Sequence, residues 1–280
     1  MALQVTFFGV RGSTPCHGDA CSKYGGNTSC VAVHVPGHDP LFLDIGTGAR
    51  DLGAGQAIDG SFRGTCLLSH LHWDHTQGLP FFTPLHSPGA HLDVYAPVQD
   101  DGRPVGDVIR DVIRPPLFPV GVDQLPGTVR FHDTADSEFL VGEVQVTARM
   151  VPHSGPTLGF RLEWNGLSIA YLSDVQQPAD GNFGVDAAAR AIADDVDLLI
   201  HDSQFTADEF AQRSTWGHCT FDYALAVAEQ CRVKSLALFH HDPARTDVAL
   251  DAMFEHADVA AHRGGFEAFI AAEGMTVTVG

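Results

Sequence analysis

The chain has very little positive charge. Lysine occurs only at positions 23 and 234, and the 280 residues carry 16 lysine and arginine side chains against 35 aspartate and glutamate side chains. The formal net charge is −19 at pH 7, and the basic residues form no patch. Such a chain repels the phosphate backbone of a nucleic acid, so we expect no large nucleic-acid interface. A small anionic substrate is still allowed, because bound divalent cations can dominate the local field.

Long apolar runs are also missing. No stretch approaches the roughly 20 apolar residues of a membrane span, so we expect no membrane partner. The opening MALQVTFFGV has no basic region before its apolar run and no clear cleavage site, and we interpret it as a first strand. The six cysteines are scattered, and without an export signal they are not expected to pair as disulfides. These features predict a cytoplasmic protein.

No repeat or low-complexity tract appears, and short β-rich runs alternate with helical patterns. We expect strands over 3–9, 30–35, 40–46, 65–70, 91–97, 144–152, 158–164, 167–174, 196–202 and 235–242. We expect helices over 49–56, 104–116, 185–195, 221–231 and 246–261, the second of them broken by its two prolines. Two sets of strands with helices between and after them predict a layered α/β sandwich with both sheets inside. No linker divides the chain, so we expect one domain over residues 1–280.

The stretch SHLHWDH, residues 69–75, places His70, His72, Asp74 and His75 within six positions. Neutral histidine is the commonest metal ligand among side chains. If the preceding strand continued through this stretch, His70 and His72 would point the same way, and a turn near Trp73 would bring the other two close by. Two diverging pairs of ligands suit two metal ions better than one. A polar turn with incidental histidines is the alternative, but four ligand-type residues so close together argue against it.

Further residues of the same types stand at the ends of later predicted strands. They are His153, Asp174, His201, Asp202, His240 and His241. Ligands gather at the edge of a sheet where parallel strands end. Each residue alone has a simpler explanation: Asp174 could cap a helix or form a turn, and His240 could be a hydrogen-bonded core histidine. Their recurrence at successive strand ends instead predicts one shared site.

The order His-x-His-x-Asp-His, then a lone His, an Asp and a final His resembles the metallo-β-lactamase fold family, as does the earlier stretch FLDIGTGARDLG. The resemblance covers essentially the whole chain and implies a four-layer αββα sandwich. It also implies two divalent metal ions, most often Zn²⁺, with Mn²⁺ or Fe²⁺ as alternatives. By position, the first ion would be held by His70, His72 and His153, the second by Asp74, His75 and His240, and Asp174 would bridge them. His241 is the alternative to His240, or else lies outside the ligand set.

Three further stretches resemble the phosphodiesterase branch of that family, which includes ribonuclease Z, phosphoribosyl cyclic phosphodiesterases and anti-Pycsar cyclic-nucleotide phosphodiesterases. They are PHSGPTLGF, DVDLLIHDSQF and TWGHCT. The resemblance implies a metal-dependent hydrolase in which His218 protonates the leaving alkoxide and Asp202 orients His218. Asp74 would be a catalytic residue as well as a ligand. An ordinary residue at a helix start is the alternative reading of His218.

Ribonuclease Z grips tRNA with an arm inserted after the bridging aspartate, and here only about 26 residues separate Asp174 from His201. With the acidic charge, this favours a small phosphodiester, such as a cyclic nucleotide or phosphoribosyl cyclic phosphate, over tRNA. Pocket walls are expected from Arg11, Ser13, Asn27 and Thr28, with residues 114–123 as a lid. A homodimer is left open.

Three alternatives remain: hydrolysis of a lactone or thioester, RNA processing like that of ribonuclease Z, and a sensor without catalysis. The Gly-His-Thr stretch common in thiolesterases and lactonases is missing, and a sensor would be expected to lose ligands.

Phosphoribosyl cyclic phosphodiesterases can carry an extra zinc near the N-terminus. The spacing of Cys16, Cys21 and Cys30 matches no familiar zinc motif, so free thiols are favoured there.

Overall fold

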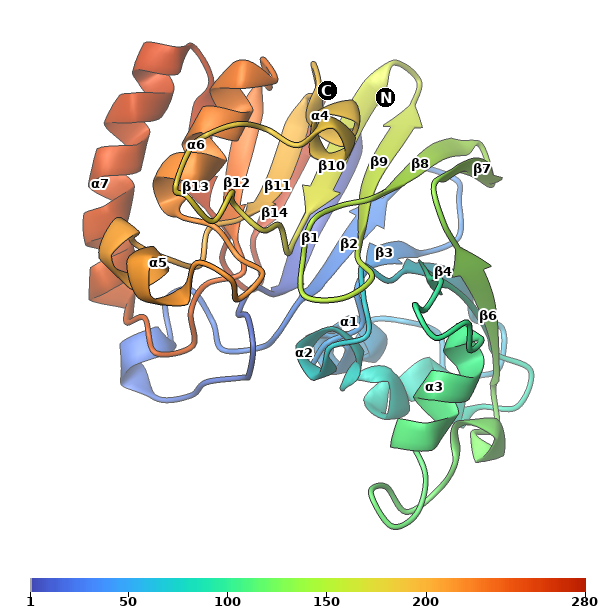
Figure 1. Cartoon of the computed structure of the whole chain (residues 1–280). Helices are drawn as coiled ribbons and strands as arrows, with labels where there is room; N and C mark the ends of the chain where they lie inside the picture. The colour runs from blue at the N-terminus through green and yellow to red at the C-terminus, as the bar shows by residue number, and fades with distance from the viewer. Residues whose placement is uncertain (1) are drawn as a thin grey trace.

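The computed structural model describes residues 2–280, in which two seven-stranded sheets face each other and helices cover both outer faces (Figure 1). In spatial order, the first sheet contains β14 (Thr276–Val279), β1 (Leu3–Gly9), β2 (Cys30–His34), β3 (Leu41–Leu43), β4 (Arg63–Leu67), β5 (His91–Pro97) and β6 (Thr128–Thr134). The second contains β13 (Glu267–Ile270), β12 (Ser235–Phe239), β11 (Leu198–Asp202), β10 (Leu167–Leu172), β9 (Leu158–Trp164), β8 (Val144–Met150) and β7 (Ser137–Val141). Both sheets mix parallel and antiparallel pairs.

The helices divide between the two sheets. Packed on the first sheet are α1 (Ala49–Ala54), α2 (Trp73–Thr76), α3 (Val105–Val112) and the short helices η2 (Leu79–Phe81), η3 (Thr83–His86) and η4 (Val122–Gln124). On the second lie α4 (Ala187–Ala193), α5 (Ala207–Arg213), α6 (Phe221–Gln230) and α7 (Asp247–Gly264), while η1 (Asp19–Cys21) belongs to the N-terminal loop. The arrangement confirms the predicted αββα sandwich. None of the helices within residues 2–280 has the length and hydropathy that crossing a membrane requires.

Three apolar clusters hold these layers together. The central one lies between the sheets and includes Leu3, Val5 and Phe7, which alternate along β1 with more exposed side chains. The other two fill the spaces between each sheet and its helices. Strands β10 and β11 are buried almost throughout, because their sheet is covered on both faces. Their sequences therefore show continuous apolar runs instead of alternation.

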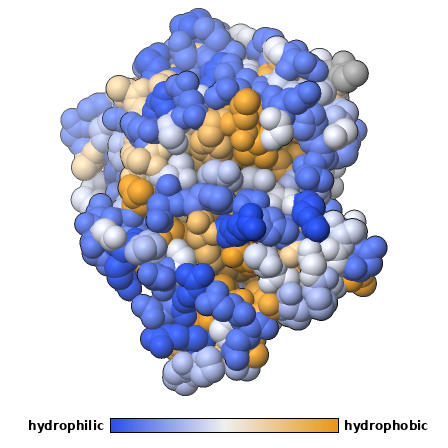
Figure 2. All heavy atoms as spheres, turned by 90° about the vertical axis from the view of Figure 1, so that its right-hand side faces the viewer, coloured by the Kyte–Doolittle hydropathy of each residue, from blue (hydrophilic) through white to orange (hydrophobic). Residues whose placement is uncertain are grey.

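Four strands were not expected from the sequence: β6, β7, β13 and β14. All four are the edge strands of the two sheets, and all except β13 carry side chains that are alternately more and less exposed. Figure 2 views the side on which β6 and β7 lie and shows apolar groups interrupted by hydrophilic ones. Helix α5 was also missed, although Thr206 and Glu209 form a capping box at its start.

Candidate metal centre and acid–base pair

The sequence had suggested that the strand continues into the SHLHWDH stretch, but it does not. Strand β4 ends at Leu67, and the Ser69 backbone N–H and hydroxyl donate to the Asp44 carboxylate at 2.6 and 2.9 Å. His70 therefore lies in a loop, and His72 is the N-cap of helix α2. Helix α2 then carries Asp74 and His75. The loop and the helix start, rather than strand alternation, bring the four side chains together.

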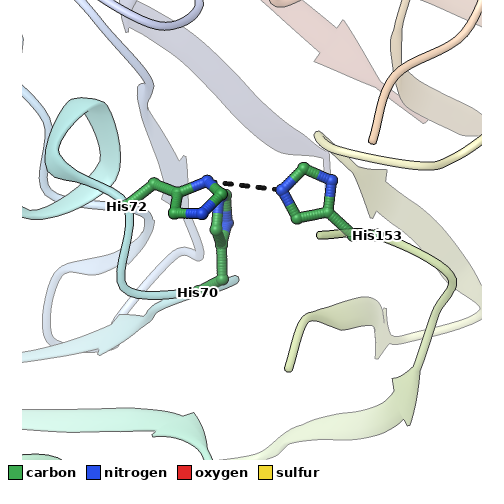
Figure 3. A group of neighbouring side chains, drawn as sticks. All are labelled: His70, His72 and His153. Carbon is green, nitrogen blue, oxygen red and sulfur yellow. Dashed lines mark hydrogen bonds between the residues drawn. The ribbon is translucent and has the colours of Figure 1, made fainter. Parts of the chain in front are cut away.

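The first cluster consists of His70, His72 and His153 (Figure 3). His70 Nε2 lies 2.8 Å from His72 Nδ1, and His153 Nε2 lies 3.3 Å from the same atom. Asp174 Oδ1 is 3.9 Å from His70 Nε2 and 3.8 Å from His153 Nε2. Three imidazole nitrogens and one carboxylate oxygen thus surround a common point.

The second cluster consists of Asp74, His75 and His240. Asp74 Oδ2 lies 3.2 Å from His75 Nε2 and 3.2 Å from His240 Nε2. Asp174 Oδ2 lies 3.3 Å from His75 Nε2 and 3.4 Å from His240 Nε2. Asp174 therefore turns one oxygen toward each cluster, which is the position that the sequence assigned to a bridging residue.

Four imidazoles are oriented by hydrogen bonds at their Nδ1 atoms. These run from His70 to Ser69 Oγ at 3.0 Å, from His75 to Asp44 Oδ2 at 2.7 Å, from His153 to the Gly217 carbonyl at 2.6 Å, and from His240 to Gln204 Oε1 at 3.0 Å. A partner on one ring nitrogen sets the tautomer and leaves the other nitrogen free to bind a metal. In all four residues the free nitrogen is the Nε2 that faces the clusters.

The residues present fit a cationic group between them. Among residues 2–280, His75 Nε2 and Asp174 Oδ2 are buried side-chain atoms without a hydrogen-bond partner, although they lie only 3.3 Å apart. Burial alone would lower the pKa of His75, but the carboxylates of Asp74, Asp174 and Asp44 raise it well above its usual value. Burial opposes ionisation of Asp174 too, but the surrounding imidazoles hold its pKa well below its usual value. Buried polar atoms without partners are costly, and divalent cations would satisfy them.

His218 lies beside both clusters but differs from the residues in them. Its Nδ1 donates to Asp202 Oδ2 at 2.9 Å and lies 3.6 Å from Asp174 Oδ1. Burial lowers the pKa of His218, but the carboxylates of Asp202, Asp174 and Asp74 raise it to about 9. His218 also completes two groups of possible ligands, one with His153 and Asp174 and one with Asp202 and His240. A protonated imidazole held by a carboxylate is better suited to donating a proton than to binding a metal.

Strained backbone is concentrated around the site. Within residues 2–280, the non-glycine residues with left-handed φ angles are Ser13, Asp44, Asn165, Asp195, Arg232 and His240. Three of these touch the clusters or support them: Ser13 through its backbone N–H on Asp74 Oδ2 at 2.6 Å, Asp44 through His75, and His240 directly. Such conformations persist where the surrounding contacts determine them and are common at functional sites.

The sequence did not predict several supporting residues. The Tyr171 hydroxyl donates to Asp44 Oδ2 at 2.6 Å, so the carboxylate that orients His75 is itself held from the second sheet. Gln204 orients His240, and Gly217 orients His153 with its carbonyl. A Cβ on Gly217, which has φ 92°, would lie 2.4 Å from His153 Nδ1, so glycine is required there. Apart from this glycine and the FLDIG resemblance around Asp44, no local signal identifies these contacts.

Other predicted residues lie away from the clusters. His241 is buried, and its Nε2 donates to the Ala271 carbonyl at 2.9 Å, so it does not compete with His240. Arg11 is buried with its guanidinium on the carbonyls of Gly25, Asp242 and Arg245, and Asn27 bonds Glu273. These contacts stabilise the N-terminal loop, and the expectation that Arg11 and Asn27 line a pocket was wrong. Thr28, also expected to line it, bonds Thr47 instead.

His201 and Asp202 are neighbours on β11 and point in opposite directions. Asp202 reaches His218, whereas the His201 ring lies 6.1 Å from the ring of Tyr223 on α6 and its Nδ1 donates to the Asp202 carbonyl.

The six cysteines are free thiols. Cys30 is buried in the core beneath α1, and no cysteine belongs to any of the groups of three possible metal ligands found in residues 2–280.

The fold and the site together define a hydrolase of the metallo-β-lactamase fold. The family model described as "Beta-lactamase superfamily domain" matches residues 64–241, and the chain belongs to that superfamily. The matched region includes every residue of both clusters, together with His218 and Asp202.

Ribonucleases Z are among the similar sequences. One from Natronomonas pharaonis is 25% identical over 338 aligned residues, which cover 100% of this chain and 98% of that protein. One from Halorubrum lacusprofundi is 27% identical, with 86% of each chain covered. These matches identify the chain as a relative of hydrolytic enzymes.

Solved structures agree with the fold. YhfI from Bacillus subtilis, a metallo-beta-lactamase fold protein, superimposes with a TM-score of 0.75 at 18% identity and 99% coverage of both chains. A diphosphatase from the PhnP family gives 0.69 at 17% identity, covering 98% of this chain and 97% of that one. Zn²⁺-bound PqqB from Methylobacterium extorquens gives 0.71 at 17% identity, covering 98% of this chain and 99% of that one. At these identities the similarity extends to the fold alone.

Proposed function

We propose that this protein is a phosphodiesterase that uses two divalent metal ions to hydrolyse a small phosphodiester, in the first place a cyclic nucleotide or a cyclic sugar phosphate. The observation that carries the proposal is the His218–Asp202 pair, which places an imidazole hydrogen-bonded to a carboxylate beside two clusters of ligand-type residues. Expulsion of an alkoxide requires a proton, and such a pair can supply one.

His70, His72 and His153 would hold one ion, Asp74, His75 and His240 the other, and Asp174 both. Zinc, manganese and iron(II) all accept these ligands. When bound, the two ions would neutralise charge on the phosphate and make water a stronger nucleophile. The chain itself orients four imidazoles through their Nδ1 atoms and keeps a proton on His218 through Asp202. No atom within residues 2–280 forms a hydrogen bond with His218 Nε2, which leaves that nitrogen available to a leaving group.

The metal content tests the two-cluster arrangement. We expect close to two metal ions per chain after mild purification, because the clusters offer seven side chains with Asp174 between them. Asp74→Ala should empty mainly the second cluster and His72→Ala mainly the first, so each variant should retain about one ion. Elemental analysis of the wild type that finds one ion or fewer, with no gain on adding zinc or manganese, would contradict the arrangement.

The protein should process tRNA precursors poorly. The segment that follows Asp174 folds onto the body: the Tyr223 hydroxyl and the Gln230 amide donate to the carbonyls of Gly184 and Phe183, and α4 packs on β8, β9 and β10. The net charge of −19 also opposes binding of a polyanion. A tRNA precursor cleavage assay at physiological salt measures this, and efficient 3′ cleavage would show that the substrate class is wrong.

A substrate panel tests the reaction itself. Protein reconstituted with zinc or manganese should hydrolyse bis-p-nitrophenyl phosphate and at least one cyclic nucleotide or cyclic sugar phosphate faster than a lactone or a thioester. Preferential hydrolysis of a lactone or thioester would identify a different hydrolase of the same fold. Absence of turnover on all classes, with both metals bound, would favour the sensor.

A further inference from the structure

An apolar pocket is lined by the two residues that flank His72 in the chain. It has a volume of about 350 Å³, and its walls include Leu71, Trp73, Phe81, Val112, Leu117 and Phe118. Among residues 2–280, no charged side chain lines it, although the chain as a whole is strongly acidic. Its size lies near the lower limit for sites that bind small molecules, and its lining is of the apolar and aromatic kind typical of them.

One wall of this pocket is the segment that carries the proposed metal ligands. Leu71 and Trp73 flank His72 in the chain, and Thr76, which also lines the pocket, donates its hydroxyl to the His72 carbonyl at 3.1 Å. His72 is itself exposed. A molecule in the pocket would therefore contact the two residues that flank this ligand in the chain.

The opposite wall comes from a separate part of the chain. It is formed by α3, by Ile113 and by Leu117 and Phe118, the last two of which belong to the segment 114–123 that the sequence suggested as a lid. The rings of Phe81 and Phe118 meet edge to face with centroids 5.6 Å apart. Despite this packing, 69% of Trp73, 51% of Phe81 and 71% of Leu117 remain exposed. Large apolar side chains left exposed together around a hollow mark a binding site.

We infer that this pocket binds an aromatic group of the substrate, such as a nucleobase, while the attached phosphate reaches the metal clusters. The inference rests on the proposed function and narrows it, because a bare sugar phosphate has no group that would gain from an apolar, aromatic-lined pocket. Flat rings gain both from removal from water and from edge and face contacts with Trp73, Phe81 and Phe118. The occupant is a small molecule because the pocket holds only about 350 Å³ and one of its walls is the segment that carries His72.

Binding of two product-like phosphates tests the inference. Calorimetry on the metal-loaded protein should show that 1-naphthyl phosphate binds about tenfold or more tightly than methyl phosphate, since both offer the same phosphate and only one offers a ring. Phe81→Ala with Leu117→Ala should abolish most of that preference. Leu140→Ala is the matched control, because Leu140 is 63% exposed on β7 and does not line the pocket. Its preference should equal that of the wild type.

Two outcomes would overturn the inference. One is equal affinity of the wild type for the two phosphates, or a preference that the double variant keeps. The other is a wild-type dimer that the double variant converts to a monomer in light scattering, with the preference unchanged, because the pocket would then be covered by a second copy. Hydrolysis of bis-p-nitrophenyl phosphate is measured separately, so the proposed function can fail or survive independently of the pocket.

Discussion

His218→Ala should slow hydrolysis of a phosphodiester with a poor leaving group, such as a ribose hydroxyl, by about 10²–10⁴-fold, the usual effect of a positioned general acid. A p-nitrophenolate leaving group needs little protonation, so the same variant should lose much less activity on bis-p-nitrophenyl phosphate. Both metals should remain, since His218 Nδ1 is occupied by Asp202 and the imidazole is not assigned to either cluster. The measurements are kcat on the two substrates and metal content by elemental analysis.

Asp202→Asn should reproduce this pattern more weakly and add a pH signature. The neighbouring carboxylates, Asp202 first, raise the pKa of His218 to about 9 against the effect of burial. A general acid works only while protonated, so the rate on the poor leaving group falls as pH rises through that pKa. Without the Asp202 charge the pKa is lower, and the alkaline fall should move down by about one pH unit or more.

The other outcomes for His218→Ala have distinct meanings. Equal losses on the two substrates would show that His218 binds the phosphate and is not the acid. Unchanged rates together with lower thermal stability would make it a structural residue. The His218 ring stacks on the His240 ring with centroids 5.1 Å apart and meets the Phe205 ring edge to face at 5.7 Å. Some loss of stability is therefore expected in any case.

Asp174→Ala should reduce phosphodiester hydrolysis by about 10³-fold or more and lower the metal content of both clusters together. Each carboxylate oxygen faces one cluster, so the substitution removes one ligand atom from each. It also removes a buried negative charge that lies within 4 Å of imidazoles in both clusters. Loss of metal-ion charge stabilisation is worth several kcal/mol in the transition state, which corresponds to about this factor.

Thermal unfolding gives a readout for Asp174 that is independent of activity. Adding zinc or manganese to chelator-treated wild type should raise its Tm, because an ion that binds only the folded state stabilises it. The increase should be small or absent in Asp174→Ala. Asp93→Ala is the matched control, since Asp93 also contacts two histidines, His91 and His132, but lies away from the clusters. A full Tm increase in Asp174→Ala would show that this residue does not share in metal binding.

Much of the architecture could be predicted from local sequence. Continuous apolar runs such as those of β10 and β11 identify strands covered on both faces, and their alternation with helical patterns identifies a layered sandwich. The edge strands β6 and β14 escaped prediction because half-exposed strands mix polar and apolar residues without a long apolar run. Strand β4 ended earlier than expected because the Ser69 backbone turns to bond Asp44, which follows the neighbouring strand β3.

The ligand-type residues were recognisable from the sequence because their chemical types recur just after strands, and parallel strands end at one edge. All seven predicted ligands do lie together, as do His218 and Asp202. Neighbouring positions were harder to separate. Asp202 faces the site and His201 faces α6 because successive side chains on a strand point to opposite sides, and the sequence does not say which side is which.

The sequence by itself determined the layered fold, the set of residues that can bind metal and the acidic charge that disfavours a polyanionic partner. Only the tertiary structure decided which atoms of His75, His153 and His240 face the clusters. Their orientation depends on Asp44, which Tyr171 holds, on Gly217 and on Gln204, and each of these residues lies far along the chain from the imidazole that it orients. It also decided that residues 71–81 and 108–118 enclose an apolar pocket. Contacts between distant segments depend on how the layers pack, and no local pattern of residues records that packing.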